Sequence, residues 1–261
     1  ITGLATVNAG SGNVTLNSAG AIVDDGSAGT VITGGVLTAD AAGAITIDST
    51  VASANISTSA AGNVDLDETD GITLTDLDTN DGSITVEAGG LITATDVVAA
   101  GGSGDSVTLT TTTGGAVATL VTGADAVSIT ANAGDITIGA VTATAGILGV
   151  TATAGSINDA ADDNTADFTA GGLITLTAQD EIGVLGSGTD TDLEFATGSS
   201  VNVSTTGTGA IDLDGLGTLT LTDLDTANGA ITATSGGALT VTDVASGTNG
   251  NITLTTTSGD I

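Results

Sequence analysis

The chain has 261 residues and contains no Lys, Arg, His, Cys, Met, Pro, Trp or Tyr, whereas Asp and Glu together number 31. Catalytic pairs of the Ser-His or Cys-His kind, Lys-based phosphate loops and zinc sites built from His or Cys are therefore excluded. Nucleic-acid binding is excluded as well, because phosphates are held by Lys and Arg and a net charge of -31 repels them.

The hydrophobic content indicates that the chain can nevertheless bury a core. Hydrophobic residues make up 40% of the sequence and the mean hydropathy is +0.42, which a solvated acidic coil would not show. Only Phe168 and Phe195 are aromatic, so we expect a core of Val, Ile, Leu and Ala. No apolar run approaches the roughly 18 residues that span a bilayer, and we expect no membrane insertion.

A short phrase, G-x-(Val/Ile)-x-(Leu/Ile/Val), recurs along the chain and sets its period. It occurs at residues 12–16, 43–47, 62–66, 82–86, 134–138, 209–213 and 250–254. Val64 and Ile84 lie 20 positions apart, as do Ile211 and Ile231. A fixed period of this size is typical of solenoid proteins, in which each repeat forms one coil.

A second short strand is expected between successive copies of this phrase. Residues 72–76, 91–96, 218–223 and 238–243 alternate apolar side chains with Thr or Asp, the signature of a strand with one buried face. Gly-rich tracts supply the corners, and the absence of Pro agrees with an unbroken ladder. A β-sandwich would need hairpins between its strands. Residue types that recur at a fixed period instead favour a solenoid, in which identical residue types stack on successive coils. The sequence therefore predicts an all-β fold, a single-stranded parallel β-helix (β-solenoid) of roughly 13 coils with 20–21 residues each and no helix.

The predicted domain organisation is one continuous solenoid segment over residues 1–261, belonging to a longer repetitive protein or filament. Residues 62–117 resemble residues 209–261, which indicates that a block of nearly three coils was duplicated. Residues 259–261 read straight into residues 1–10 also reproduce the rhythm of residues 134–146. We therefore expect such units to stack head to tail along the solenoid axis, within one giant chain or between subunits.

Several longer phrases resemble those of a known family. GNVTLNSAGAI at residues 12–22, TATAGSINDAADD at 151–163 and AGGLITLTAQDEIG at 170–183 are similar to the repeats of large bacterial exoproteins with filamentous-haemagglutinin-like repeats. The resemblance is one of rhythm and composition, and it extends over nearly the whole chain. It implies a β-helix shaft that is exported and displayed at the cell surface, where its partners are cell-surface or matrix components.

Pairs of Asp in D-L-D spacing are the main chemical feature of the sequence. Strand alternation sends both carboxylates outward, and the one-coil spacing places Asp76 over Asp96 and Asp223 over Asp243. At a strand separation of about 4.8 Å such a pair repels by on the order of 1 kcal/mol in water, which a bound Ca²⁺ would offset. The alternative is that each Asp accepts backbone N–H groups in its turn and stays solvated. The candidate calcium ligands are Asp65, Asp67, Asp76, Asp78, Asp96, Asp212, Asp214, Asp223, Asp225 and Asp243.

Two further interpretations use the same outward side chains. Outward Thr pairs such as Thr73 and Thr75, or Thr220 and Thr222, form ranks of hydroxyls that can order water, although Thr also simply suits the outer face of a strand. An ice-binding module is therefore one alternative. Paired carboxylates also catalyse glycoside hydrolysis in enzymes that act on polysaccharides. The substrate clefts of such enzymes are lined by aromatic residues, which are almost absent from this chain. A polysaccharide-acting enzyme is thus a remote alternative, and we predict no enzymatic activity.

Together these observations predict an extracellular structural β-solenoid that serves as a filament or surface-spacer unit. A calcium-dependent adhesin is the alternative from the class of binding proteins, and it requires a patch that departs from the repeat. The least repetitive stretch of the chain is residues 158–199.

Overall fold

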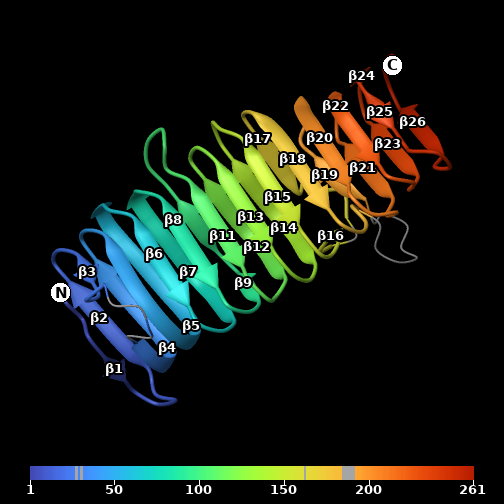
Figure 1. Cartoon of the computed structure of the whole chain (residues 1–261). Helices are drawn as coiled ribbons and strands as arrows, with labels where there is room; N and C mark the ends of the chain where they lie inside the picture. The colour runs from blue at the N-terminus through green and yellow to red at the C-terminus, as the bar shows by residue number, and fades with distance from the viewer. Residues whose placement is uncertain (27–28, 30–31, 162, 184–191) are drawn as a thin grey trace.

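The computed structural model of the chain is an elongated stack of β coils (Figure 1) and describes residues 1–26, 29, 32–161, 163–183 and 192–261. These residues contain no helix, and hence none that is long and apolar enough to cross a membrane. Successive coils pair through parallel strands, with about 20 residues per turn. The predicted fold class, an all-β parallel solenoid, is confirmed.

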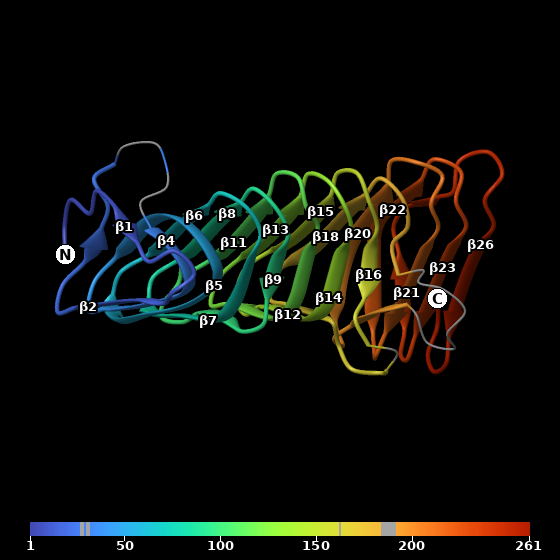
Figure 2. The same ribbon diagram turned by 90° about the horizontal axis from the view of Figure 1, so that it is seen from below.

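The strands form two long ladders, which Figure 2 shows as two layers with β11, β13 and β15 in one and β7, β12 and β14 in the other. The first ladder runs through β3 (Ile22–Val23), the start of β5 (Ile45–Ala61), β6 (Val64–Glu68), β8 (Ile84–Ala88), β11 (Val107–Thr111), β13 (Val127–Ala131), β15 (Leu148–Ala152), β18 (Leu173–Ala178), β20 (Ser199–Thr205), β22 (Leu219–Thr226), β24 (Leu239–Val241) and β25 (Val244–Ala245).

The second ladder forms the opposite layer. It runs through β1 (Val7–Asn8), β2 (Val14–Ser18), β4 (Ile32–Ala41), the later part of β5, β7 (Ile72–Asp81), β9 (Ile92–Ala94), β10 (Val97–Ala99), β12 (Ala116–Gly123), β14 (Ile136–Ala143), β16 (Ile157–Asp159), β17 (Phe168–Ala170), β19 (Leu193–Phe195), β21 (Ile211–Gly215), β23 (Ile231–Ser235) and β26 (Ile252–Thr256).

The core lies between the two ladders and is built from stacked aliphatic rows. In the first ladder Ile84 pairs with Val107, and Val107 pairs with Val127. Each of these side chains is no more than 1% exposed. Because strand residues alternate between the two faces, every second side chain enters such a row, and burial of a Val or Ile side chain stabilises the fold by roughly 1.5–3 kcal/mol.

Glycine allows the coils to approach closely at their corners. A Cβ placed on Gly229 would lie 1.8 Å from the carbonyl oxygen of Gly209 in the coil below. A Cβ on Gly209 would in turn lie 2.0 Å from the carbonyl oxygen of Asp180. Backbone contact between coils therefore requires the Gly that begins the phrase at residues 62, 82, 209, 229 and 250.

The two similar sequence blocks occupy different ladders. Val64 belongs to β6 of the first ladder, whereas its sequence counterpart Ile211 belongs to β21 of the second ladder. Leu74 and Leu221 are exchanged in the opposite sense, because they lie in β7 and β22. Either ladder thus accepts the same alternating pattern, since both present one apolar face to the shared core.

The solenoid has about 11 turns, so the prediction of roughly 13 coils was wrong. The reason is that coils differ in length. Ile45 pairs with Val64 after 19 residues, whereas Leu148 pairs with Ile174 after 26 and Ile174 pairs with Val201 after 27. Eleven strands at the sheet spacing give a rod of roughly 50 Å.

The stacked core gives a direct test of the fold. Replacement of Ile129 by Ala, at a site that is 0% exposed, is expected to lower the free energy of unfolding by about 2–5 kcal/mol, because it leaves a cavity in the row. Leu120→Ala on the neighbouring β12, where Leu120 is 38% exposed, should cost less than about 1 kcal/mol. Urea unfolding followed by far-ultraviolet circular dichroism measures both variants, and equal losses would contradict the assigned core.

Candidate metal centre

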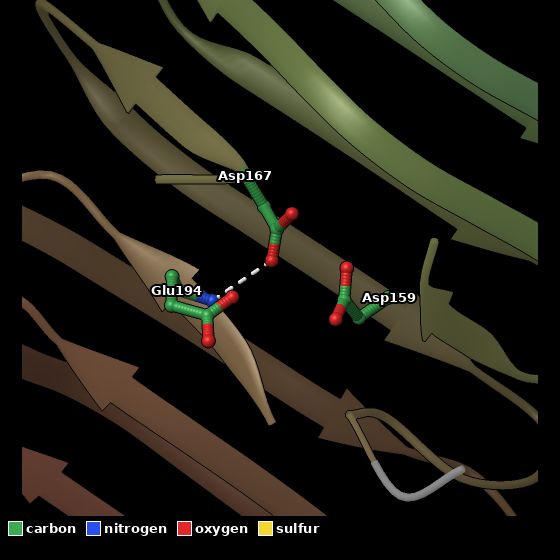
Figure 3. Close-up of side chains that lie close together, drawn as sticks. All are labelled: Asp159, Asp167 and Glu194. Atoms are coloured by element: carbon green, nitrogen blue, oxygen red, sulfur yellow. Dashed lines mark hydrogen bonds between the residues drawn. The ribbon is translucent and has the colours of Figure 1, made fainter. Parts of the chain in front are cut away.

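Three acidic side chains from the second ladder converge at one corner of the solenoid. Asp159 ends β16, Asp167 directly precedes β17, and Glu194 lies in the middle of β19. Figure 3 shows their carboxylates facing one another. Each offers one oxygen such that all three atoms lie within 4.8 Å of one another, and no other group of three potential ligands among the described residues meets this criterion.

The triad lies at the base of an insertion in each of two consecutive coils. Asp159 pairs with Ile138, and Phe168 pairs with Val141. Eight residues lie between Asp159 and Phe168, whereas only two lie between their partners Ile138 and Val141 in the preceding coil. In the next coil, ten residues separate Ile182 from Leu193, whereas a single residue separates their partners Ile211 and Leu213. Asp159 and Asp167 flank the first insertion, and Glu194 follows the second.

Strand register places Asp159 in an inward row, whereas Glu194 pairs with Asp214 on the outward alternation of β21. Asp159 pairs with Ile138, which pairs with Ala118, and both of those are core side chains, so Asp159 occupies an inward row. Glu194 is 1% exposed and Asp167 is 4% exposed, while Asp159 is half-buried. The triad is therefore largely removed from water, although carboxylates are almost never fully buried without a partner.

Backbone N–H groups form hydrogen bonds to only some of the carboxylate oxygens of the triad. The N–H of Glu194 donates to Oδ2 of Asp167 at 2.9 Å, and the N–H of Ala161 donates to Oδ1 of Asp159 at 2.9 Å. Both carboxylate oxygens of Glu194 are buried and have no hydrogen-bond partner. Each unpaired buried oxygen carries a desolvation cost, so this arrangement requires a proton or a cation between the carboxylates.

Burial dominates the protonation chemistry of the triad. It raises the pKa of Glu194 well above the usual range, and the neighbouring carboxylate of Asp167 raises it further. Burial likewise raises the pKa of Asp167 and of Asp159. Two charged carboxylates 4.8 Å apart repel by roughly 3 kcal/mol at an effective dielectric constant of about 20.

An aromatic pair lies next to two of the triad residues in the chain. Phe168 and Phe195 directly follow Asp167 and Glu194, are fully buried, and stack with a centroid distance of 5.4 Å and an interplanar angle of 26°. Their row ends at Gly215, which pairs with Phe195 and has no side chain. The only two aromatic residues of the chain thus lie in the core where the coils lengthen.

This geometry can hold a metal ion. All donors are carboxylate oxygens, the ligand type preferred by hard cations such as Ca²⁺ and Mg²⁺. The neighbourhood supplies further negative charge, because Asp214 pairs with Glu194 across β19 and β21. The chain has no Lys, Arg or His that could neutralise the cluster.

None of the ten candidate calcium ligands predicted from the sequence belongs to the triad, and their role stays a prediction. Eight of them lie on outward positions of strands in the two ladders, whereas Asp96 and Asp243 lie between strands, and Oδ1 of Asp96 is buried without a hydrogen-bond partner. Asp76 and Asp96 do lie on adjacent coils, because Leu77 pairs with Val97 and the N–H of Leu77 donates to the carbonyl of Asp96 at 2.9 Å. The same arrangement recurs for Asp223 and Asp243 at the pair Leu224 and Val244.

Neutral side chains occupy the other side of these Asp pairs. Asp76 and Asp78 pair with Asn55 and Ser57, and the amide of Asn55 donates to Asp76 at 3.3 Å. Asp223 and Asp225 pair in the same way with Asn202 and Ser204. Of the remaining candidates, Asp67 pairs with both Asp48 and Glu87 in a row of three acids, Asp65 pairs with Thr46 and Thr85, and Asp212 pairs with Thr232.

The Thr residues singled out as pairs do not form one flat rank. Thr75 in β7 and Thr222 in β22 lie at β-bulges, where they have no paired residue on the preceding coil. The hydroxyl of Thr75 donates to the carbonyl of Ala54 at 2.8 Å. A regular uncharged surface exists instead on the first ladder, from β11 to β20. We call it the hydroxyl face, and its outward residues are Thr108, Thr110, Ser128, Thr130, Gly149, Thr151, Thr175, Thr177, Asn202 and Ser204.

Sequence reasoning missed the triad, although a signal was present. The stretch 158–199 is the least repetitive part of the chain, and it contains all three acids and both Phe residues. Asp159 also stands two positions after Ile157, where the phrase elsewhere has an apolar residue. Comparison of the chain with protein-family models, curated proteins and solved structures found no match.

The acidic surface predicts a defined pH dependence. Burial, with repulsion from Asp192 and Asp214, raises the pKa of Asp212 to about 6. The unfolded chain has a value of about 3.9, so the native state binds this proton more tightly. The stabilisation is complete below about pH 3.9 and is lost as the pH rises through 6.

In a chelating buffer, the urea midpoint of the wild type should therefore fall between pH 4.5 and pH 7.5, and Asp212→Asn should reduce this fall. Asp81→Asn makes the same charge change at an exposed site and is the control. Equal pH profiles for Asp212→Asn and the wild type would contradict the assignment.

Proposed function

We propose that the chain is a structural, non-enzymatic rod that serves as a filament or surface-spacer element outside the cell. The observation that carries this proposal is the pair of ladders, in which each coil stacks on the next through parallel pairing over about 11 turns. Backbone hydrogen bonds between coils run along the axis of the rod, so bending requires many of them to open together. Such a rod holds its two ends at a fixed distance.

The chemistry of the surface supports an extracellular role. With 31 acids and no basic side chain, separate rods repel one another laterally, which favours solubility. The rhythm shared with bacterial exoproteins of the filamentous-haemagglutinin type also supports export and display at the cell surface. Cell-surface or matrix components are the partners that this resemblance suggests, and we propose contact with them at the insertion-bearing corner of residues 158–199, where the repeat is broken.

We propose further that rods associate head to tail. Ile211, Ile231 and Ile252 form one row across β21, β23 and β26, in which the first two are buried and Ile252 is 45% exposed. A ladder that pairs like residues on successive coils can be extended by a coil of the same chain or of a second copy.

Axial association can be measured by sedimentation over a concentration range. The wild type should form oligomers as concentration rises, and electron microscopy should show rods that lengthen at constant width. Ile252→Asp should lower this association at least about tenfold, because it places a charge in an apolar contact. Ile147→Asp is the control, since Ile147 is 63% exposed and precedes β15 in the middle of the rod. A monomeric wild type at high concentration would overturn head-to-tail stacking.

Calcium belongs to this proposal as a counterion of the outer acidic rows. Asp48, Asp67 and Glu87 pair in register on three coils. Burial raises the pKa of Asp48 and of Asp67, and repulsion from nearby acids, Asp24 for Asp48 and Asp65 and Asp48 for Asp67, raises it further. A divalent cation relieves this repulsion along the rod and can bridge two rods. The calcium-dependent form of adhesion would act through this bridging.

A second candidate function, ice binding, is favoured by the hydroxyl face. Five successive coils there carry no charged outward residue, although the chain is strongly acidic elsewhere. One row carries a hydroxyl on each of these coils at the strand spacing of about 4.8 Å (Thr110, Thr130, Thr151, Thr177 and Ser204), whereas the neighbouring row is interrupted by Gly149 and Asn202. Such a regular rank can order water.

Ice binding is tested by thermal hysteresis and ice-crystal shape. If the hydroxyl face binds ice, Thr130→Lys at its centre should abolish hysteresis, whereas Thr93→Lys on the second ladder should leave it unchanged. No hysteresis in the wild type would remove this candidate and leave the rod proposal intact.

A further inference from the structure

The triad of Asp159, Asp167 and Glu194 is the one place in the described chain where three carboxylates are held together out of water. Neither oxygen of Glu194 has a hydrogen-bond partner, and Glu194 is 1% exposed. Figure 3 shows its carboxylate directed toward those of Asp159 and Asp167. A solvated acidic patch would not show this, because its oxygens would be bonded to water.

We propose that this triad binds one Ca²⁺, which fastens the two insertion-bearing coils to each other. The site is independent of the rod and of the outer acidic rows. Its ligands come from three segments, the end of β16, the start of β17 and β19, of which β17 and β19 pair directly while an insertion separates β16 from β17. A cation held between the three carboxylates attracts each of them and thereby offsets their mutual repulsion.

The geometry favours calcium over smaller or softer ions. Three atoms that lie within 4.8 Å of one another can all be within about 2.8 Å of a single point. Calcium binds oxygen at about 2.3–2.6 Å in irregular geometry, so only a small contraction is needed, whereas Mg²⁺ demands about 2.0–2.1 Å and an octahedron. The absence of His and Cys removes the ligands that Zn²⁺ prefers. Three bidentate carboxylates supply up to six oxygens, and water completes the shell.

The neighbouring residues would make the site rigid. Asp167 is fixed on both sides of its backbone, because its N–H donates to the carbonyl of Glu194 at 3.0 Å and its carbonyl accepts the N–H of Val141 at 2.7 Å. The stacked Phe168 and Phe195 hold the adjacent strands. A site whose ligands are held in place before binding loses little entropy when the cation enters.

The competing explanation is that the three carboxyl groups share protons and bind no metal. The two explanations differ in their response to calcium. Proton sharing predicts no calcium binding at the triad and no change in stability with calcium beyond that of the outer rows. Cation binding predicts a one-to-one event that the outer rows do not produce.

The test uses the full chain at pH 7.5 and constant ionic strength, with Ca²⁺ or Mg²⁺ titrated calorimetrically. The wild type should show one calcium ion bound per chain, with Mg²⁺ at least about tenfold weaker. Glu194→Gln and Asp159→Asn should lose this event. Asp81→Asn, an exposed site with the same charge change, should keep it.

Thermal melting supplies a readout that a merely structural role would not give. In chelator, Glu194→Gln should melt at or above the temperature of the wild type, because it replaces a buried carboxyl group whose oxygens have no partner. In calcium the order should reverse, since only the wild type gains the bound ion. Amide exchange at residues 163–170 and 192–196 should slow with calcium in the wild type alone.

Three results would overturn the proposal. The first is the absence of one-to-one calcium binding by the wild type. The second is an equal rise in melting temperature with calcium for the wild type and Glu194→Gln, which would assign the effect to the outer rows. If Glu194→Gln fails to fold, Asp159→Asn at the half-buried position decides the question, and retention of the binding event by that variant is the third.

Discussion

In-register stacking is the constraint on which the rest of the structure depends. In a parallel ladder each side chain lies on its counterpart one coil away, at about 4.8 Å. The consequence is favourable for Ile84, Val107 and Val127, whose stacking makes a continuous core. It is unfavourable for acids, because a chain with 31 carboxylates and no basic residue cannot place opposite charges on adjacent coils.

The acids on the surface and the acids of the triad have different neighbours. On the surface, Asp76 and Asp223 each stack on an Asn, which separates them from further acids on that side and donates a hydrogen bond in the case of Asn55. At the triad no neutral partner intervenes, and Glu194 is left without one. The two places therefore differ in the partners of their carboxylates, although Oδ1 of Asp96 among the outer acids is likewise buried without a hydrogen-bond partner.

The insertions explain how a regular repeat comes to contain an irregular site. Two consecutive coils lengthen at the same corner, and the chain must leave and rejoin the ladder there. The residues that flank these exits are no longer bound by the alternating pattern, so Asp159 enters a row that is otherwise apolar. Phe168 and Phe195 fill the same stretch of core.

The sequence by itself determined the fold class, because period and alternation encode which side chains must face a shared core. It also determined that chemistry based on His, Cys, Lys or Arg is excluded. Only the tertiary structure decided the number of coils, the exchange of ladders between the similar blocks, and the convergence of Asp159, Asp167 and Glu194. The reason is that these three acids are separated by insertions, and their distance depends on where the chain rejoins the ladder. Spacing along the sequence reports the period of a regular repeat but does not report the position at which an interrupted one resumes.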